Sequence, residues 1–513
     1  MNSKYKNLLI ALLTALSLAA IAFTAEAKLA FNITNSNGKN TYKVKNLDGS
    51  FDVEYDGEID LSDDDTDIVG ISRGGYFELS KSSFGSSRKI KIESDRDGLT
   101  KRYFVGWSEQ DWEPEGRKWL AEVLPSLVRS TTIAAESRVD RIYGKGGSAA
   151  LVKELGMLEG DYVKHTYFKL AFQKDLTDAD QSKMLAIAGE TVGSDHYLSQ
   201  ILMSYLERYG LTAQTVDNYV SAADAIQSDH YKTNVLMAVA KSDEIKGAQL
   251  TKLIKGSDGI ASDHYKSNAL IEIMERKKLD DDQMAALLSE SKDIQSDHYL
   301  SNVLITVIKT QELSAGRISQ FTQVSNYIQS DHYKSNVYSE LLGSRTLNAN
   351  ALKMVLGSFS DIQSDTYMSR ILIDLLQDAQ DESTLTVLFD LAGNSMDSDH
   401  YLSEVLKTAV RRQDLSGRSM EAFVTALGRI GSDHYATTVL EEAAKKSLTE
   451  SNMVKLLGAA SHIGSDHYLS NGLMALSRQV NSMSDEVKEA YRSAARQISS
   501  DTYYGKAMKA IDY

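Results

Sequence analysis

The sequence predicts an α+β protein, with a small antiparallel β-rich domain followed by an α-solenoid of about ten helical hairpins, each of 34 residues. Three observations predict this. Short segments near the N-terminus alternate polar with apolar residues. Further on, the motif Ser-Asp-x-Tyr recurs every 34 residues, as from Ser262 to Ser296. Between motifs, apolar residues follow helical spacing. We expect a β-rich domain at 28–113, a helical junction at 114–159 and a solenoid at 160–513.

Residues 1–27 have the pattern of a secretory signal peptide. Lys4 and Lys6 precede an apolar run at 8–23, and Ala25-Glu26-Ala27 forms a small-x-small cleavage site. The apolar run has 16 residues, which is short for a membrane span, although an uncleaved anchor is the alternative. We therefore expect a periplasmic or secreted protein that begins at Lys28 and has no membrane span after cleavage.

Composition excludes several functions. The chain contains no cysteine, so it can form neither disulfides nor thiolate metal sites. Its net charge is −15, and residues 1–27 carry Lys4, Lys6 and Glu26, so removing that +1 leaves −16. An acidic chain of this kind is a poor candidate for binding nucleic acid or anionic membranes.

The β-rich domain is predicted from four segments, 51–55, 76–79, 89–92 and 102–105, which turn residues such as Gly74-Gly75 and Asp97-Gly98 separate. Five aspartates lie within residues 60–67. Their spacing is not that of a calcium-binding loop, and the expected glycine is missing. We interpret this segment as a solvated loop.

The stretch where the β pattern gives way to a helical one contains all three tryptophans, Trp107, Trp112 and Trp119, and both prolines, Pro114 and Pro125. Pro114 suits the first turn of a helix, where its missing N–H is not needed. We expect the tryptophans to be buried where the sheet docks on the first helices, with stacking on a sugar as the alternative. Residues 144–148 have phosphate-loop residues in the wrong order and are interpreted as a linker.

Each repeat combines two helical patterns. Tyr299, Val303 and Leu304 begin one apolar face, and Ile318 and Phe321 begin a second, so units must stack to cover both faces. The sequence Gly160-Asp161-Tyr162 is interpreted as a degenerate first copy. The motif itself is assigned a structural role: Ser or Asp caps a helix, and Tyr packs between repeats. The motif residues are Ser194, Asp195, Tyr197, Ser228, Asp229, Tyr231, Ser262, Asp263, Tyr265, Ser296, Asp297, Tyr299, Ser330, Asp331, Tyr333, Ser364, Asp365, Tyr367, Ser398, Asp399, Tyr401, Ser432, Asp433, Tyr435, Ser465, Asp466, Tyr468, Ser500, Asp501 and Tyr503.

Eight of the ten histidines lie in the motif and form a predicted ladder. Packed helices lie about 8–10 Å apart, whereas each imidazole on a zinc lies about 2 Å from it. Thr366 and Thr502 also replace His without changing Ser, Asp or Tyr. We therefore expect a structural ladder without metal or cofactor, and a metal- or pH-responsive ladder is the alternative. Its members are His196, His230, His264, His298, His332, His400, His434 and His467.

The sequence lacks the catalytic patterns His-Glu-x-x-His and Gly-x-Ser-x-Gly and has no cysteine nucleophile. Ser, Asp and His adjacent in one helical turn do not form a triad, since the three groups of a triad converge in space. We expect that the protein is not an enzyme. The alternative is an active site at the junction, near residues 107–119.

The pattern Ile-x-Ser-Asp-x-Tyr-x-x-x-x-Leu, as at residues 294–304, resembles HEAT-like repeats of exported bacterial proteins. These include repeats joined to antirepressor metallopeptidases of the beta-lactam-sensor type. The resemblance covers residues 160–513, and residues 70–107 and 116–120 are similar to the region before such repeats. It implies the solenoid, export and a signalling context. The peptidase and its metal motif are absent, so no activity is implied.

These inferences predict a non-catalytic exported protein-binding scaffold, with a role in envelope signalling. Its partner should be a protein or peptide, bound along repeats between about Ser228 and Ser432. Positions that vary between repeats are expected to face solvent and contact that partner; they are Lys266, Leu300, Lys334, Met368, Leu402 and Ala436.

Overall fold

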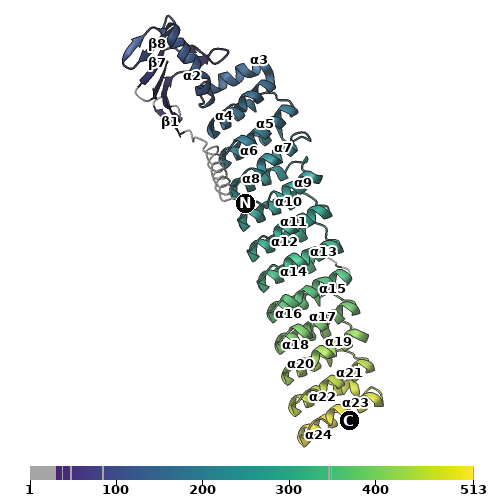
Figure 1. Cartoon of the computed structure of the whole chain (residues 1–513). Helices are drawn as coiled ribbons and strands as arrows, with labels where there is room; N and C mark the ends of the chain where they lie inside the picture. The colour runs from purple at the N-terminus through teal and green to yellow at the C-terminus, as the bar shows by residue number, and fades with distance from the viewer. Residues whose placement is uncertain are drawn as a thin grey trace, which may run out of the picture. The chain divides into compact units, whose positions relative to one another are not determined.

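The computed structural model describes residues 30–36, 39–46, 49–83, 86–344, 347 and 349–511 (Figure 1). The predicted signal peptide, residues 1–27, lies outside this set. The chain divides into two compact units, Met1–Gln227 and Ser228–Tyr513. Among the described helices, none combines the length and the apolar character needed to cross a membrane.

The first unit contains a seven-stranded antiparallel sheet of order β1-β2-β3-β6-β7-β8-β9 and a two-stranded sheet β4-β5 inserted between β3 and β6. The strands are β1 Ala30–Ser36, β2 Lys39–Asn46, β3 Gly49–Asp56, β4 Ile59–Leu61, β5 Ile68–Ile71, β6 Tyr76–Ser83, β7 Ser86–Ser94, β8 Leu99–Val105 and β9 Ser108–Gln110. The four predicted strands fall within β3, β6, β7 and β8, and the expected β-rich domain is confirmed.

Alternation along the strands gives the sheet one covered face. Cross-strand pairing places Val53, Leu79, Ile90 and Tyr103 in one row on this face, and every member of the row is buried. Helix α2 (Arg117–Arg129) packs on the same core, and the rings of Tyr103 and Trp119 lie 5.9 Å apart. The β-rich domain is therefore closed by a helix that follows it in sequence.

The aspartate-rich segment is not a simple solvated loop, so that expectation is wrong. Asp65 is 9% exposed, and its carboxylate is bound by Arg138 and Arg141 from the helix that begins at Ala135. Asp67 pairs with Lys101 at 2.5 Å. The carboxylates are positioned by partners distant in sequence, which a search for calcium-loop spacing could not reveal.

The first unit also contains helices that follow the sheet. They are the π-helical turn η1 Trp112–Gly116, α2, α3 Ala135–Leu155, α4 Asp161–Ala171, α5 Asp178–Thr191, α6 Asp195–Tyr209 and α7 Val216–Asp224. The segment 144–148, expected as a linker, instead lies inside α3 and carries its kink at Gly147, where φ is 63°. A positive φ without steric cost requires glycine, which explains Gly147 at the kink.

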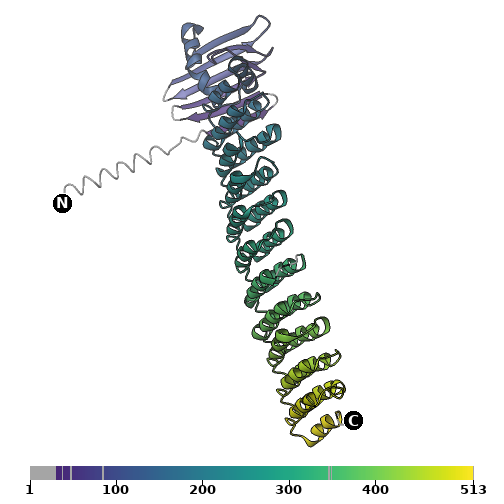
Figure 2. The ribbon, with the colours of Figure 1, turned by 90° about the vertical axis from the view of Figure 1, so that its right-hand side faces the viewer.

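The second unit is a stack of helical hairpins in two rows (Figures 1 and 2). The inner row contains α8 Asp229–Ala240, α10 Asp263–Arg276, α12 Asp297–Thr310, α14 Asp331–Ser344, α16 Asp365–Leu375, α18 Asp399–Arg412, α20 Asp433–Ala443, α22 Asp466–Val480 and α24 Asp501–Lys509. The outer row contains α9 Gly247–Lys255, α11 Asp281–Ser291, α13 Ala315–Ser325, α15 Ala349–Gly357, α17 Glu382–Ser395, α19 Gly417–Leu427, α21 Glu450–Ala460 and α23 Asp485–Ala495, and the turn η2 Ser358–Asp361 follows α15. The predicted α-solenoid is confirmed.

The varied positions that were expected to face solvent are buried, so that prediction is wrong. Lys266 is 3% exposed and Leu300 is 1% exposed; Lys334, Met368, Leu402 and Ala436 are buried as well. Each follows the motif Tyr directly, on the helix face that packs on the neighbouring repeat. Variation at these positions therefore changes the core rather than the surface.

Candidate functional site

The repeated edge of the array is formed by the Asp, His and Tyr of each motif and by the residue four positions after His. Each inner-row helix of the second unit begins at the motif Asp, so these side chains occupy its first two turns. Their positions recur from one repeat to the next because the motif spacing is nearly constant. The edge is the most regular surface that the described residues offer.

The motif Asp joins each repeat to the next. The two carboxylate oxygens of Asp297 accept hydrogen bonds from the backbone N–H groups of Gln329 and Ser330, at 3.0 and 2.7 Å. In the first unit, Asp161 accepts from Gly193 and Asp195 accepts from Gln227. The same paired contacts are made by Asp229 (Ala261, Ser262), Asp263 (Gln295, Ser296), Asp331 (Gln363, Ser364), Asp365 (Asp397, Ser398), Asp399 (Gly431, Ser432), Asp433 (Gly464, Ser465) and Asp466 (Ser499, Ser500).

This contact corrects the expected side-chain cap. Ser296 occupies the N-cap position in extended conformation, with φ −79° and ψ 116°, but its side chain makes no cap hydrogen bond. Its backbone N–H instead donates to Asp263 of the preceding repeat at 2.7 Å. The motif thus fixes the chain where one repeat enters the next, and Asp161 makes an equivalent contact, as expected of a first copy.

The histidines and tyrosines alternate in an aromatic stack that is interrupted once. The ring centroid of His298 lies 5.1 Å from that of Tyr299 and 5.7 Å from that of Tyr333 in the next repeat. Two segments of this stack run from His230 to Tyr367 and from His400 to Tyr503, and Thr366 separates them. The tyrosine rings are half-buried and the histidines are exposed.

Six of the eight motif histidines also face an amide one turn later in their helices. The Nε2 of His298 and the Nδ2 of Asn302 lie 3.3 Å apart. An amide nitrogen can only donate, so this contact is a hydrogen bond when Nε2 carries no proton. The same pair occurs at His230 with Asn234, His264 with Asn268, His332 with Asn336 and His467 with Asn471, and His196 faces Gln200.

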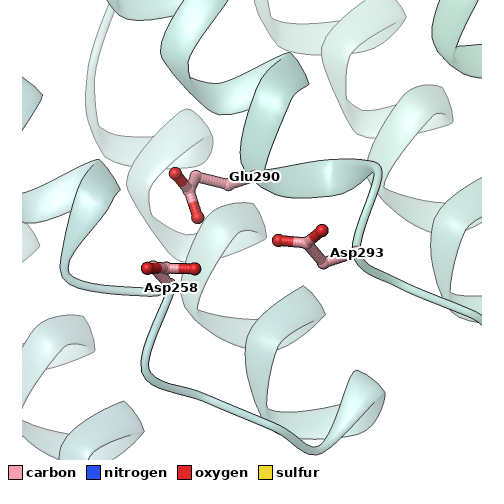
Figure 3. A group of neighbouring side chains, drawn as sticks. All are labelled: Asp258, Glu290 and Asp293. Carbon is pink, nitrogen blue, oxygen red and sulfur yellow. The ribbon is translucent and has the colours of Figure 1, made fainter.

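The ladder does not bring two imidazoles together, because a tyrosine ring lies between successive histidines. Within the described residues, three potential metal ligands converge elsewhere, at Asp258, Glu290 and Asp293 (Figure 3). The ammonium of buried Lys266 lies 3.3 Å from the Asp293 carboxylate and supplies a cation within the chain. Burial is the main cause that raises the pKa of Glu290. Lys266 opposes this rise, and the neighbouring carboxylates of Asp258 and Asp293 add to it.

The junction tryptophans are separated. Trp119 is 4% exposed in the core beneath the sheet, and Trp112 packs partly buried against that core. Trp107, by contrast, is fully exposed in the turn between β8 and β9. The expected burial is therefore correct for Trp119 and wrong for Trp107. No single Trp-lined site exists among these residues for the alternative of an enzyme at the junction.

A buried ionic network lies nearby, between the aspartate segment and α3. The guanidinium of Arg138, which is fully buried, donates to Asp65 at 2.7 and 3.1 Å and to Glu154 at 2.7 Å. Burial alone would raise the pKa of Asp65, but Arg138 and Arg141 lower it. Because these charges satisfy one another within the chain, we assign them to holding the sheet on α3.

No protein-family model matches the sequence, and no curated protein matches it. One similar structure is a homology model of the full-length AP-3 complex in an intermediate open conformation. Its sequence identity is 11% and its TM-score is 0.22, and the match covers 76% of this chain and 92% of that chain. Another is a circular tandem repeat protein with novel repeat topology and enhanced subunit contact surfaces. Its sequence identity is 13% and its TM-score is 0.15, and the match covers 78% of this chain and 90% of that chain. Both similarities are too weak to assign a family or a function.

Proposed function

We propose that this chain is an exported, non-catalytic scaffold that binds an extended peptide segment of a partner protein along its repeated edge. The observation that carries the proposal is a strip of four His–Asn pairs, each with an exposed histidine, on consecutive inner helices, α8, α10, α12 and α14. We call Asn234, Asn268, Asn302 and Asn336 the amide strip. Each amide offers both a donor and an acceptor, as a peptide backbone requires.

An apolar band accompanies the amide strip. Met237, Ile271 and Ile305 lie three positions after the respective asparagines, on the same helix face, and all three are half-buried. An extended peptide presents its backbone groups along one edge and alternate side chains to one face. The two parallel strips can therefore bind backbone and side chains at the same time.

The strip of asparagines ends after α14. Arg370, Glu404 and Thr438 replace the asparagine in α16, α18 and α20, and Thr366 interrupts the aromatic stack at the same place. Four helices spaced about 8–10 Å apart span roughly 24–30 Å between the first and last axes. An extended chain rises about 3.3 Å per residue, so a peptide of roughly eight or nine residues would cover the strip.

Selectivity would come from exposed residues one turn further along the helices. Lys241, Glu275 and Lys309 follow the asparagines by seven positions and alternate in charge between repeats. The net charge of −15 favours a neutral or basic peptide and faster association at low salt. We assign to these three positions the partner contact that the sequence analysis predicted for residues after the motif Tyr, such as Lys266 and Leu300. Those residues are buried in the structure.

Export is the second part of the proposal and rests on the signal pattern of residues 1–27. We predict that intact-mass measurement of the secreted or periplasmic protein gives a chain beginning at Lys28. A mature protein that retains residues 1–27 would contradict the periplasmic assignment. The proposed role in envelope signalling rests on the family resemblance.

The peptide site is tested by selecting random extended peptides on the full mature chain and titrating the enriched sequences. Replacing two amides, as in Asn268→Ala with Asn302→Ala, removes two sets of hydrogen bonds worth about 1 kcal/mol each, so affinity should fall at least tenfold. Asn471→Ala is the matched control, because Asn471 faces His467 at 3.3 Å but lies outside the strip. Equal affinities for the double variant and the wild type would exclude the strip as the site.

A further inference from the structure

The β8–β9 turn carries an uncovered apolar tip. Gly106 and Trp107 connect Val105 to Ser108, and Gly106 has a φ of 61°. The exposed fraction of Trp107 is 103% and that of Val105 is 43%. Tryptophan is usually well buried in folded proteins, so a ring without cover on its own chain indicates an external contact.

The sheet continues this tip into a row at the margin of the core, in which Phe51 packs partly buried against the core. Cross-strand pairing aligns Phe51, Lys81, Arg88 and Val105 on the same face as the core rows, but one row further towards the turn. We call these four residues the open row. Val105 and Arg88 are exposed, whereas Val53, Leu79 and Ile90 two positions along the strands are buried.

The open row is cationic in an acidic protein. The ammonium of Lys81 lies 4.7 Å from the ring centroid of Phe51, and neither Lys81 nor Arg88 forms an ion pair with any residue that the structure describes. On the opposite face, Lys89 and Lys91 are each paired with a glutamate. The next row towards the turns consists of Ser50, Ser82 and Ser87. Neither this row nor the open row contains a carboxylate in β3, β6, β7 or β8.

We propose that the open row and Trp107 bind the surface of an anionic lipid bilayer. The indole ring and the Val105 side chain would enter the boundary between headgroups and acyl chains, where tryptophan is favoured. Lys81 and Arg88 would contact the lipid phosphates. The acidity of the whole chain opposes such binding, but charges beyond about 8–10 Å are largely screened at physiological salt. Binding is therefore weak, reversible and sensitive to salt.

The size of the surface favours a bilayer over a protein partner. A stable protein interface buries about 800 Å² on each partner and needs a complementary shape. One turn and one row of side chains provide a narrow contact, and a bilayer adapts to it without a preformed pocket. The proposal is independent of peptide binding, which uses the second unit.

Vesicle flotation of the full mature chain tests the proposal, with phosphatidylcholine alone compared with phosphatidylcholine mixed with phosphatidylglycerol. We expect binding to the mixed vesicles only, and quenching of tryptophan fluorescence by brominated acyl chains. Trp107→Phe should still bind but lose most of the quenching, because Trp119 is buried. Arg88→Glu should reduce binding at least fivefold, since one basic residue near the surface contributes about that factor.

Arg96→Glu is the matched control, because Arg96 is exposed in the β7–β8 turn at the opposite end of the sheet. It should bind as the wild type does. Unchanged binding of Trp107→Ala would overturn the proposal, as would failure of the wild type to bind the mixed vesicles. In the latter case an acidic protein becomes the occupant to test. Circular dichroism of each variant verifies that the sheet is folded.

Discussion

The same contact joins successive repeats: the carboxylate of the motif aspartate binds the backbone of the next repeat. Asp297 accepts from Gln329 and Ser330, and the equivalent contact recurs throughout the second unit. A shorter or neutral side chain would leave two backbone N–H groups without this charged acceptor. The contact explains why the motif keeps Asp365 where Thr366 replaces His.

We predict that Asp297→Ala lowers the free energy of unfolding by about 2–3 kcal/mol, because hydrogen bonds to a charged acceptor are lost at a partly buried site. His298→Thr should cost no more than about 1 kcal/mol, since it removes ring contacts with Tyr299 and Tyr333 at an exposed position. Urea denaturation of both variants gives the comparison. Equal losses would contradict the assigned role of the aspartate.

A second residue-scale prediction concerns Glu290. Burial raises the pKa of its carboxyl above the ordinary value of 4.5. The folded state then binds the proton more tightly than the unfolded state. The contribution of Glu290 to stability is therefore greatest below pH 4.5 and decreases as pH rises through the raised pKa. Glu290→Gln should remove this decrease and stabilise the protein at neutral pH. Denaturation midpoints at several pH values test it, and a variant less stable than wild type at pH 7 would contradict it.

At the scale of elements, the sheet is joined to α3 by buried charges rather than by apolar packing alone. Arg138 is fully buried between Asp65 and Glu154, and the Tyr167 hydroxyl lies 2.5 Å from its guanidinium. Removing one partner of such a network leaves an uncompensated charge in a site with little water.

We predict that Arg138→Met lowers stability by about 3–5 kcal/mol because Asp65 and Glu154 lose their shared cation. Lys145→Met is the control: its ion pair with Asp63 is exposed, and its loss should cost less than about 1 kcal/mol. Guanidinium denaturation measures both. Similar small losses would show that the network does not hold the sheet on α3.

For the whole molecule, constant spacing makes the repeat a modular unit. Deleting residues 297–330 joins Ser296 to Asp331 and restores every motif contact in register. We predict a folded chain with unchanged helicity per residue and a smaller denaturant m-value, because one repeat less is exposed on unfolding. Deleting only Asp297–Thr310 removes one helix of a hairpin and should disrupt the fold. Far-ultraviolet circular dichroism with denaturant titration distinguishes the two.

The sequence alone determined the period, the two helices per repeat and the main strands. These follow from local rules: an apolar face at a given spacing selects a helix or a strand, and a fixed period requires stacking. The sequence left Ser296 or Asp297 as the residue that caps the inner helix, and the structure starts this helix at Asp297.

Only the tertiary structure decided which groups meet across the chain. Asp297 contacts a backbone segment 32 and 33 positions later, and Asp65 meets Arg138 across 73 positions. Whether Lys266 was buried depended on how the next repeat packs, because helical spacing alone leaves two faces available for the core. Trp107 was expected in the core because of its type, whereas the hairpin turn placed it outside. Spacing along the chain specifies local geometry, but partners, burial and exposure depend on how the elements pack.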